Sequence, residues 1–279
     1  MTHLLRVDDL AELLNQPTPP KLLDVRWRLD QPDGREQYRA GHLPGAVYVD
    51  LDGELADQSI QGHGRHPLPT TDALQQAAQR WGLNGGDTVV AYDDVRGIAA
   101  ARAWWLLRQA GVDVRVLDGG LRAWQAAGFE LETGDVHPPR GDIHLDAIGN
   151  DALTIEDAER FPEQGVLVDV RAPERYNGHS EPLDPVAGHI PGAVNVPTGT
   201  HFDAAGNLLA PEQLRSNFAA AGIDQATPVA IYCGSGIAAT HTALLLADLG
   251  IHAQVFPGSW SEWSTTSNKP IATVESVAS

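Results

Sequence analysis

The chain has 279 residues, a formal net charge of −18 and only two lysines, Lys21 and Lys269. This length predicts two domains of about 130–140 residues, and the shortage of basic residues argues against nucleic acid or an anionic membrane as a partner. A single cysteine cannot form an internal disulfide. No apolar run is as long as a membrane span, which needs about 18 residues. We therefore expect a soluble, cytoplasmic protein.

Along the chain, five short segments of the first half recur in the same order in the second half, 139–147 residues later. The matched pairs are 22–26 with 167–171, 41–47 with 188–194, 90–93 with 230–233, 97–100 with 236–239, and 117–124 with 256–263. Such ordered self-similarity indicates two copies of one domain. We predict domains at 1–133 and 151–279, joined by the polar, Pro/Gly-bearing stretch 134–150 as an extended surface linker.

Each copy alternates short apolar strands with helical segments. In the second copy the expected elements are strands at 166–170 and 193–196, a helix at 211–221, a central strand at 228–232, a helix at 237–249 closed by Gly250, and a strand at 253–256. This alternation predicts an α/β fold in which helices flank a mainly parallel sheet on both faces. Ligands of such sheets bind beyond the carboxyl ends of the strands.

Cys233, the only cysteine, stands at that end of the central strand, immediately before a helix. Converging backbone N–H groups and the positive end of the helix dipole favour the reactive thiolate at such a place. The alternative is a buried, inert cysteine, the commoner fate of a lone thiol. The first copy has Asp93 at the matching position, and a carboxylate cannot accept and pass on sulfur. Thiol chemistry is therefore expected only in the second copy.

The loop after Cys233 carries Gly234 and Gly236, followed by Ile237 and Ala238. Glycines let the backbone curl so that successive N–H groups face one point, which forms an anion-binding nest. We predict that this loop holds the thiolate or the terminal sulfur of a persulfide. An ordinary strand-to-helix turn is the alternative, and it is the turn that we expect at 93–97 in the first copy.

In each copy, an arginine follows the buried strand of the D-V-R segment, at 22–26 and at 167–171. Arg171 has its counterpart in Arg26, and the duplicated His42 and His189 form a similar pair, so all four are expected to be structural. Arg175 has no counterpart and could orient an anionic substrate by bidentate contact. The segment 63–66 (HGRH) lacks the Glu of H-E-x-x-H, and one cysteine makes no zinc site, so we expect no metal.

Taken together, these residues resemble the rhodanese family, specifically the tandem sulfurtransferases that act on thiosulfate or 3-mercaptopyruvate. The resemblance rests on the duplicated D-V-R and G-H-[IL]-P-G-A motifs, the C-G-S-G loop, the closing G-x-x-x-W element and aspartate in place of cysteine in the first copy. It implies two tandem rhodanese-like domains, a catalytically inactive first one, a persulfide on Cys233 and no cofactor.

The resemblance also concerns the donor. C-G-[ST]-G loops accompany 3-mercaptopyruvate in this family, whereas C-R-K-G loops accompany thiosulfate, so Gly234 and Ser235 slightly favour 3-mercaptopyruvate. The family further implies a relay of Ser235, His66 and Asp52, and a carboxylate-binding role for Arg175. A second carboxylate-binding arginine is absent from the matching stretch 177–187.

These features predict a sulfurtransferase that moves sulfur from a small anionic donor, through a Cys233 persulfide, to cyanide, a thiol or a thioredoxin-like acceptor. Thiosulfate:cyanide transfer proper and a persulfide carrier without turnover are the alternatives. A phosphatase or arsenate reductase of the C-x5-R type is disfavoured because Ala239 stands where the arginine is needed.

Overall fold

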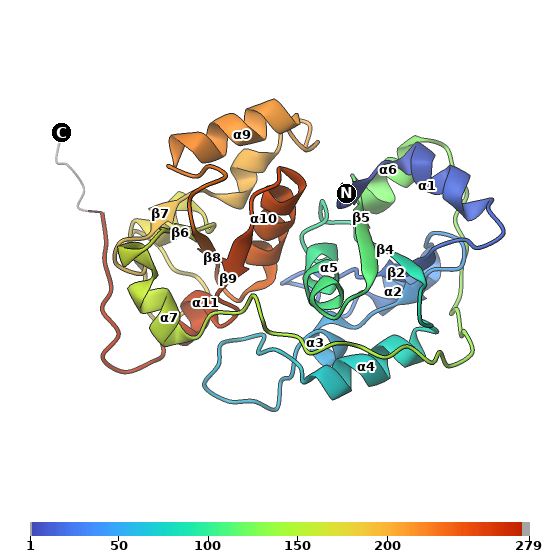
Figure 1. Ribbon diagram of the computed structural model, residues 1–279, viewed down its shortest axis with the longest axis horizontal. Coiled ribbons are helices and arrows are strands. Elements are labelled where there is room, and N and C mark those ends of the chain that lie inside the picture. Colours follow the sequence, from blue (N-terminus) through green and yellow to red (C-terminus); the bar gives the residue numbers. More distant parts are fainter. Residues whose placement is uncertain (1, 275–279) are drawn as a thin grey trace. The chain divides into compact units, whose positions relative to one another are not determined.

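The computed structural model describes residues 2–274 (Figure 1). The chain divides into two compact units. The first unit comprises Met1–Asp57 and Leu68–Asn150, and the second comprises Gln58–Pro67 and Asp151–Ser279. The short segment Gln58–Pro67 thus lies inside the sequence range of the first domain but packs with the second unit.

The first unit is built on a five-stranded parallel sheet with strand order β1-β5-β4-β2-β3. Its strands are β1 (Leu4–Leu5), β2 (Lys21–Asp24), β3 (Val47–Tyr48), β4 (Thr88–Tyr92) and β5 (Asp113–Leu117). Its helices are α1 (Val7–Leu14), α2 (Arg35–Ala40), α3 (Leu51–Glu54), α4 (Thr71–Arg80), α5 (Ala100–Gln109) and α6 (Gly120–Ala126).

The second unit repeats this plan with a four-stranded parallel sheet of order β7-β6-β8-β9. Its strands are β6 (Val166–Asp169), β7 (Val194–Asn195), β8 (Val229–Tyr232) and β9 (Ala253–Val255). Its helices are α7 (Ile155–Arg160), η1 (Phe161–Glu163), α8 (Pro173–Tyr176), η2 (Thr198–His201), α9 (Pro211–Ala220), α10 (Ile237–Asp248) and α11 (Ser259–Trp263). A parallel bridge between Ala152 and Val255 occupies the edge that β1 takes in the first unit.

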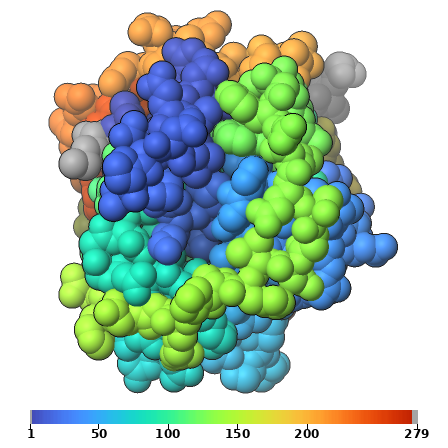
Figure 2. All heavy atoms as spheres, turned by 90° about the vertical axis from the view of Figure 1, so that its right-hand side faces the viewer, coloured from blue at the N-terminus to red at the C-terminus, as the bar shows by residue number. Residues whose placement is uncertain are grey.

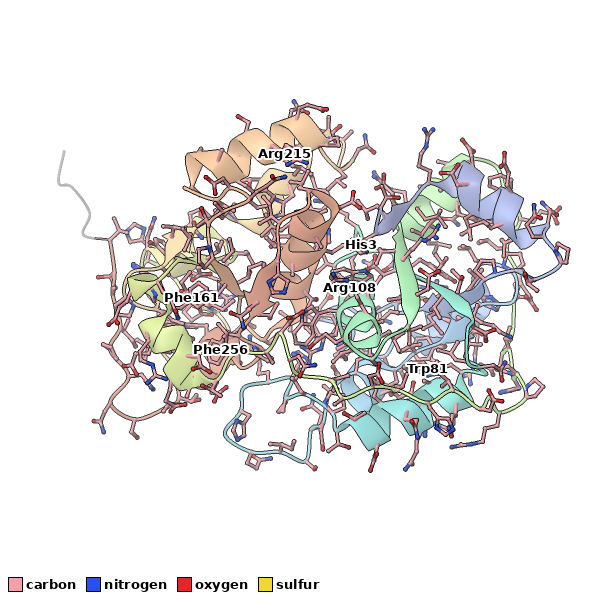
Figure 3. The ribbon with its side chains drawn as sticks, viewed as in Figure 1. His3, Trp81, Arg108, Phe161, Arg215 and Phe256 are labelled. Atoms are coloured by element: carbon pink, nitrogen blue, oxygen red, sulfur yellow. The ribbon has the colours of Figure 1, made fainter. Side chains whose placement is uncertain are left out.

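Apolar runs explain the central elements of the second unit. All four residues of β8 are buried, and nine residues of α10 are buried as well. Because strand side chains alternate between faces, Ala230 and Tyr232 join one core cluster with Phe161 and Phe256, both labelled in Figure 3. Helix α10 packs against β8 and β9. The predicted α/β layering with a parallel sheet is confirmed.

The stretch 134–150 has no helix or regular strand. Its backbone is nevertheless fixed to the first unit, because Gly141 N–H donates to Gln79 O (2.8 Å) and Ile143 N–H to Leu83 O (3.2 Å). The Ile143 side chain is only 4% exposed. Figure 2 shows this yellow-green segment running over the surface of the first unit.

Helices of the described part, residues 2–274, are all too short or too polar to cross a membrane.

Candidate active site

Cys233 lies at the carboxyl end of β8, one loop before α10, and its side chain is buried. The N–H of Gly236 donates to Cys233 Sγ at 3.1 Å. Gly236 has φ +81°, and a Cβ added there would lie 2.3 Å from Pro257 O, so only glycine fits without strain. The loop therefore directs a backbone donor at the sulfur, where it stabilises negative charge.

The start of α11 holds the same loop from the other side. Ser259 Oγ accepts the Cys233 N–H at 3.1 Å, and the Cys233 carbonyl accepts from Trp260 N–H at 3.0 Å. The Gly234 carbonyl accepts from Ser261 N–H at 2.9 Å. Because the polar groups of the loop backbone are bonded to α11, the position of the sulfur is fixed by the fold.

In the first unit, the equivalent loop after β4 is filled by its own carboxylate. Asp93 is fully buried and accepts four backbone N–H groups, from Val95 (2.8 Å), Gly97 (2.8 Å), Ala99 (2.8 Å) and Ala100 (2.9 Å). Burial raises the pKa of Asp93 to about 6, and these four donors oppose the rise. The first loop is thus an anion nest occupied by a side chain, and the expectation of an ordinary turn at 93–97 is wrong.

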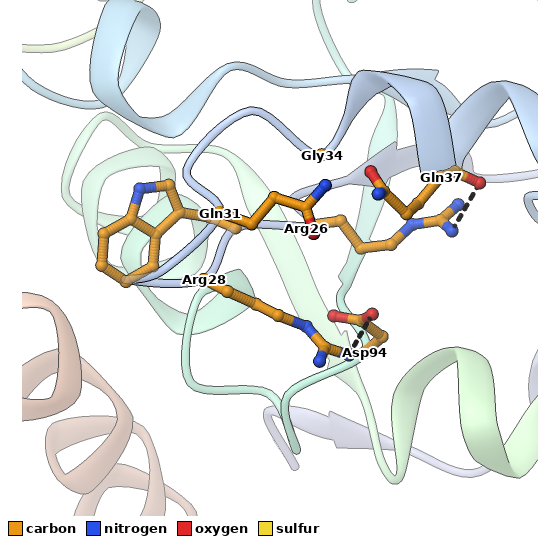
Figure 4. Close-up of a pocket in the computed structure, with 7 residues that line it drawn as sticks. Arg26, Arg28, Gln31, Gly34, Gln37 and Asp94 are labelled. Carbon is orange, nitrogen blue, oxygen red and sulfur yellow. Dashed lines mark hydrogen bonds and ion pairs between the residues drawn. The ribbon is translucent and has the colours of Figure 1, made fainter.

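A cavity of about 180 Å³ lies beside that first loop (Figure 4). Its lining residues are Arg26, Trp27, Arg28, Gln31, Gly34, Gln37 and Asp94. Arg28 Nη2 pairs with Asp94 Oδ2 at 2.7 Å, and Arg26 Nη1 donates to Gln37 O at 3.0 Å. The cations of this cavity are therefore already engaged by groups of the same unit.

The duplicated arginines bind their neighbouring aspartates. Arg171 Nη2 contacts Asp169 Oδ2 at 2.6 Å and Gly188 O at 2.5 Å, which ties the G-H-I-P segment to β6. Arg26 makes the same contacts with Asp24 and Gly41 O in the first unit. The structural interpretation of this pair is confirmed.

Arg175 lies in α8 and is directed at the cysteine loop. Its Nη2 contacts Glu181 Oε1 at 2.7 Å and Asp184 Oδ2 at 3.1 Å, and its side chain is 17% exposed. Its Nη2 and Nη1 atoms are 3.3 and 3.4 Å from the position that a Cβ on Gly234 would take. Arg175 is thus brought next to the Cys233 loop.

The remaining predicted site residues lie in different places. Ile237 and Ala238 begin α10, directly after the loop. Ser235 and His66 both belong to the second unit and are both buried. Asp52 belongs to the first unit, where it accepts a hydrogen bond from Trp27 Nε1 at 2.9 Å. The relay of Ser235, His66 and Asp52 stays a prediction.

Sequence reasoning missed Arg65. This residue forms an ion pair with Asp184, and its N–H donates to Ser261 Oγ at 3.0 Å. The preceding Gly64 has φ +81°, and a Cβ there would lie 2.4 Å from Gly258 O. The one sequence signal is an arginine directly after a glycine, in a chain with 19 basic and 37 acidic residues. For the segment 63–66 the sequence gives only the failed metal motif and the relay role expected of His66, and no role for Arg65.

Within residues 2–274, no group of three or more His, Cys, Asp or Glu side chains is placed to hold a metal ion.

Residues 6–127 and 154–266 both match the rhodanese-like domain. The chain belongs to the rhodanese family. Within the rhodanese family it is a member of the tandem-domain sulfurtransferases of the 3-mercaptopyruvate/thiosulfate type. The predicted fold class and the predicted family are confirmed.

Relatives of this rhodanese-family chain cover nearly its whole length. It is 46% identical to the Mycobacterium tuberculosis protein named "Putative thiosulfate sulfurtransferase SseB", over 96% of each chain. It is 41% identical to the "Probable 3-mercaptopyruvate sulfurtransferase" of Pseudomonas aeruginosa, over 97% of this chain and 98% of that protein. The structure of 3-mercaptopyruvate sulfurtransferase from Leishmania major superposes with a TM-score of 0.86 at 28% identity, covering 97% of this chain and 76% of that one.

Proposed function

We propose that Cys233 carries sulfur as a persulfide between a small anionic donor and a thiophilic acceptor. One observation carries the proposal: the second unit holds a buried thiol, with a backbone N–H at its sulfur, in the type of loop that the first unit uses to bind a carboxylate. A loop built for an anion stabilises both the thiolate and the negative terminal sulfur of a persulfide.

The chemistry divides into two displacements. The Cys233 thiolate attacks the donor sulfur, a new S–S bond forms, and sulfite leaves thiosulfate or the enolate of pyruvate leaves 3-mercaptopyruvate and takes up a proton. An acceptor such as cyanide, a small thiol or a thioredoxin-like protein then attacks the outer sulfur and restores the thiolate. Covalent storage of this kind predicts ping-pong kinetics.

Both donors have support in the names of the relatives, one of which specifies thiosulfate and another 3-mercaptopyruvate. The proposal gives Arg175 the role of orienting the anionic end of the donor. It gives Ser235 and His66, with Asp52, the role of polarising a donor carbonyl or moving a proton as sulfur leaves. The C-G-S-G loop slightly favours 3-mercaptopyruvate.

Intact-protein mass spectrometry after exposure to each donor tests the proposal. Wild type should gain the mass of one sulfur atom, and Cys233→Ser should gain none. In the presence of cyanide, the enzyme should release pyruvate or sulfite repeatedly. A carrier without turnover would release the product only once, so this measurement separates the two. An equal mass gain in Cys233→Ser, or none in wild type, contradicts the proposal.

A further inference from the structure

Two guanidinium groups from distant parts of the chain meet over the cysteine loop. Arg65 Nη2 is 3.0 Å, and Arg175 Nη2 is 3.3 Å, from the position that a Cβ on Gly234 would occupy. Arg65 comes from the segment Gln58–Pro67 and Arg175 from α8, and both belong to the second unit. A side chain at position 234 would fill the space beneath the two cations.

Carboxylates hold both arginines in place. Asp184 uses one oxygen for Arg65 Nη1 and the other for Arg175 Nη2, and its side chain is only 3% exposed. Glu181 pairs with Arg175 and also with Arg171. Burial raises the pKa of Asp184, as does Glu181, whereas Arg65 and Arg175 lower it. By pairing with both arginines, Asp184 fixes the spacing of the two guanidinium groups.

Donor groups remain available on both arginines. The Nε of Arg65 is buried and has no hydrogen-bond partner among residues 2–274. The ion pairs of the two arginines use Arg65 Nη1, Arg175 Nε and Arg175 Nη2. Within residues 2–274, these ion pairs leave Arg65 Nη2 and Arg175 Nη1, both close to Gly234, for another acceptor. A forked pair of this kind matches a planar or trigonal oxyanion.

We propose that Arg65 and Arg175 form a paired-arginine site above Gly234 that binds the anionic group of the sulfur donor, with Asp184 as its positioning residue. Arg65 then supplies the second cation, which the stretch 177–187 lacks. The shared ligand chemistry is an oxyanion, either the sulfonate end of thiosulfate or the carboxylate of 3-mercaptopyruvate. This inference rests on the proposed function of Cys233.

Titration calorimetry on Cys233→Ala protein tests the site without turnover, with thiosulfate and 3-mercaptopyruvate as separate ligands. Adding Arg65→Ala should weaken binding at least about tenfold, the size expected for losing a charge-assisted hydrogen bond. Arg65→Lys should recover part of the affinity, since it keeps the charge but not the fork. The ligand that loses more affinity identifies the oxyanion that Arg65 contacts.

The matched control is Arg215→Ala, which removes an exposed arginine on α9 of the same unit, labelled in Figure 3. Steady-state assays use protein that keeps Cys233. In these assays, Arg65→Ala should raise the KM for the donor at least about tenfold and change kcat much less. If Arg65→Ala binds both ligands as tightly as Arg215→Ala does, the inference is overturned. Failure of wild type to load sulfur overturns the proposed function instead, and the binding result still decides on the arginine site.

Discussion

At the residue scale, the loops that follow β4 and β8 differ at the position that decides their chemistry. Asp93 brings its own negative charge to the backbone N–H groups of the first loop. Cys233 places a sulfur atom in the second loop, within reach of Gly236 N–H. The same local fold thus anchors a buried carboxylate in one unit and, in the proposed function, holds the reactive thiol in the other.

Replacing Asp93 by alanine should destabilise the first unit, because four buried N–H donors lose their acceptor. An unsatisfied buried donor costs about 1–3 kcal/mol and such costs do not add fully, so we expect a loss of about 3–5 kcal/mol in the free energy of unfolding. Formate has the carboxylate that this variant lacks, so we expect it to bind in the vacated nest. The thermal midpoint of Asp93→Ala should therefore rise more in potassium formate than in potassium chloride of equal ionic strength.

The neighbouring Asp94→Ala is the control for Asp93→Ala. Its carboxylate pairs with a half-exposed Arg28, so its removal should cost less than about 1 kcal/mol and show no response specific to formate. If Asp93→Ala were as stable as wild type, or if formate and chloride acted alike on it, the description of this loop as an anion nest would be wrong.

At the element scale, the turn from β8 into α10 depends on Gly236. A methyl group there would lie 2.3 Å from Pro257 O in a backbone with φ +81°. Gly236→Ala should lower the free energy of unfolding by at least about 2 kcal/mol. It should also slow sulfur loading of Cys233, because the N–H that faces Sγ is displaced. Urea unfolding and timed mass spectrometry measure the two effects.

Gly199→Ala is the comparison for Gly236→Ala, since a methyl at Gly199 would meet no atom within 4 Å. Its stability and its loading rate should both match those of wild type. A normal loading rate in Gly236→Ala would show that the backbone donor at the sulfur does not matter for the reaction.

Elements dominated by local apolar patterns could be predicted closely. The predicted helix at 237–249 is observed at Ile237–Asp248, and the predicted strand at 228–232 is observed at Val229–Tyr232. These segments bury most of their residues, so their apolar runs and the turn residues beside them identify them. The convergence of Cys233 and Arg175 follows as well, because both come after strands of one parallel sheet.

Arg65 could not be predicted in the same way. It lies in a segment without helix or strand, and its partner Asp184 is 119 positions away along the chain. Periodicity reports which face of an element is buried, but it does not report which loops meet. The acidic stretch 177–187 lacks the second carboxylate-binding arginine that the family implies. Its Glu181 and Asp184 instead form ion pairs with arginines supplied by other segments.

At the scale of the whole molecule, the net charge of −18 opposes the approach of an anionic donor, whereas Arg65 and Arg175 place guanidinium groups over Gly234. Long-range repulsion of an anionic donor is screened beyond about 8–10 Å at physiological salt. Contacts within the site are shorter than that and are screened much less. Paired arginines over Gly234 therefore suit an anionic donor despite the acidic surface.

The stability of the whole chain should depend on pH through His201 in the second unit. Burial lowers the pKa of His201 to about 4 from 6.5, and its Nε2 lies 3.1 Å from Thr242 Oγ1. The unfolded chain therefore binds a proton that the folded chain excludes between these values. The stabilisation that comes from keeping His201 neutral in the fold is fully present above pH 6.5. As the pH falls from 6.5 toward 4, the free energy of unfolding decreases by roughly 3 kcal/mol in all.

Urea unfolding of wild type and His201→Gln across this pH range measures the effect. The variant should lose less stability on acidification, whatever its stability at neutral pH, because glutamine does not titrate. His252→Gln, which removes a largely exposed histidine paired with Asp151, should keep the wild-type slope. Parallel slopes for wild type and His201→Gln would show that another group governs the acid sensitivity. A flattened slope for His201→Gln alone would locate that sensitivity beside α10, the helix that also follows Cys233.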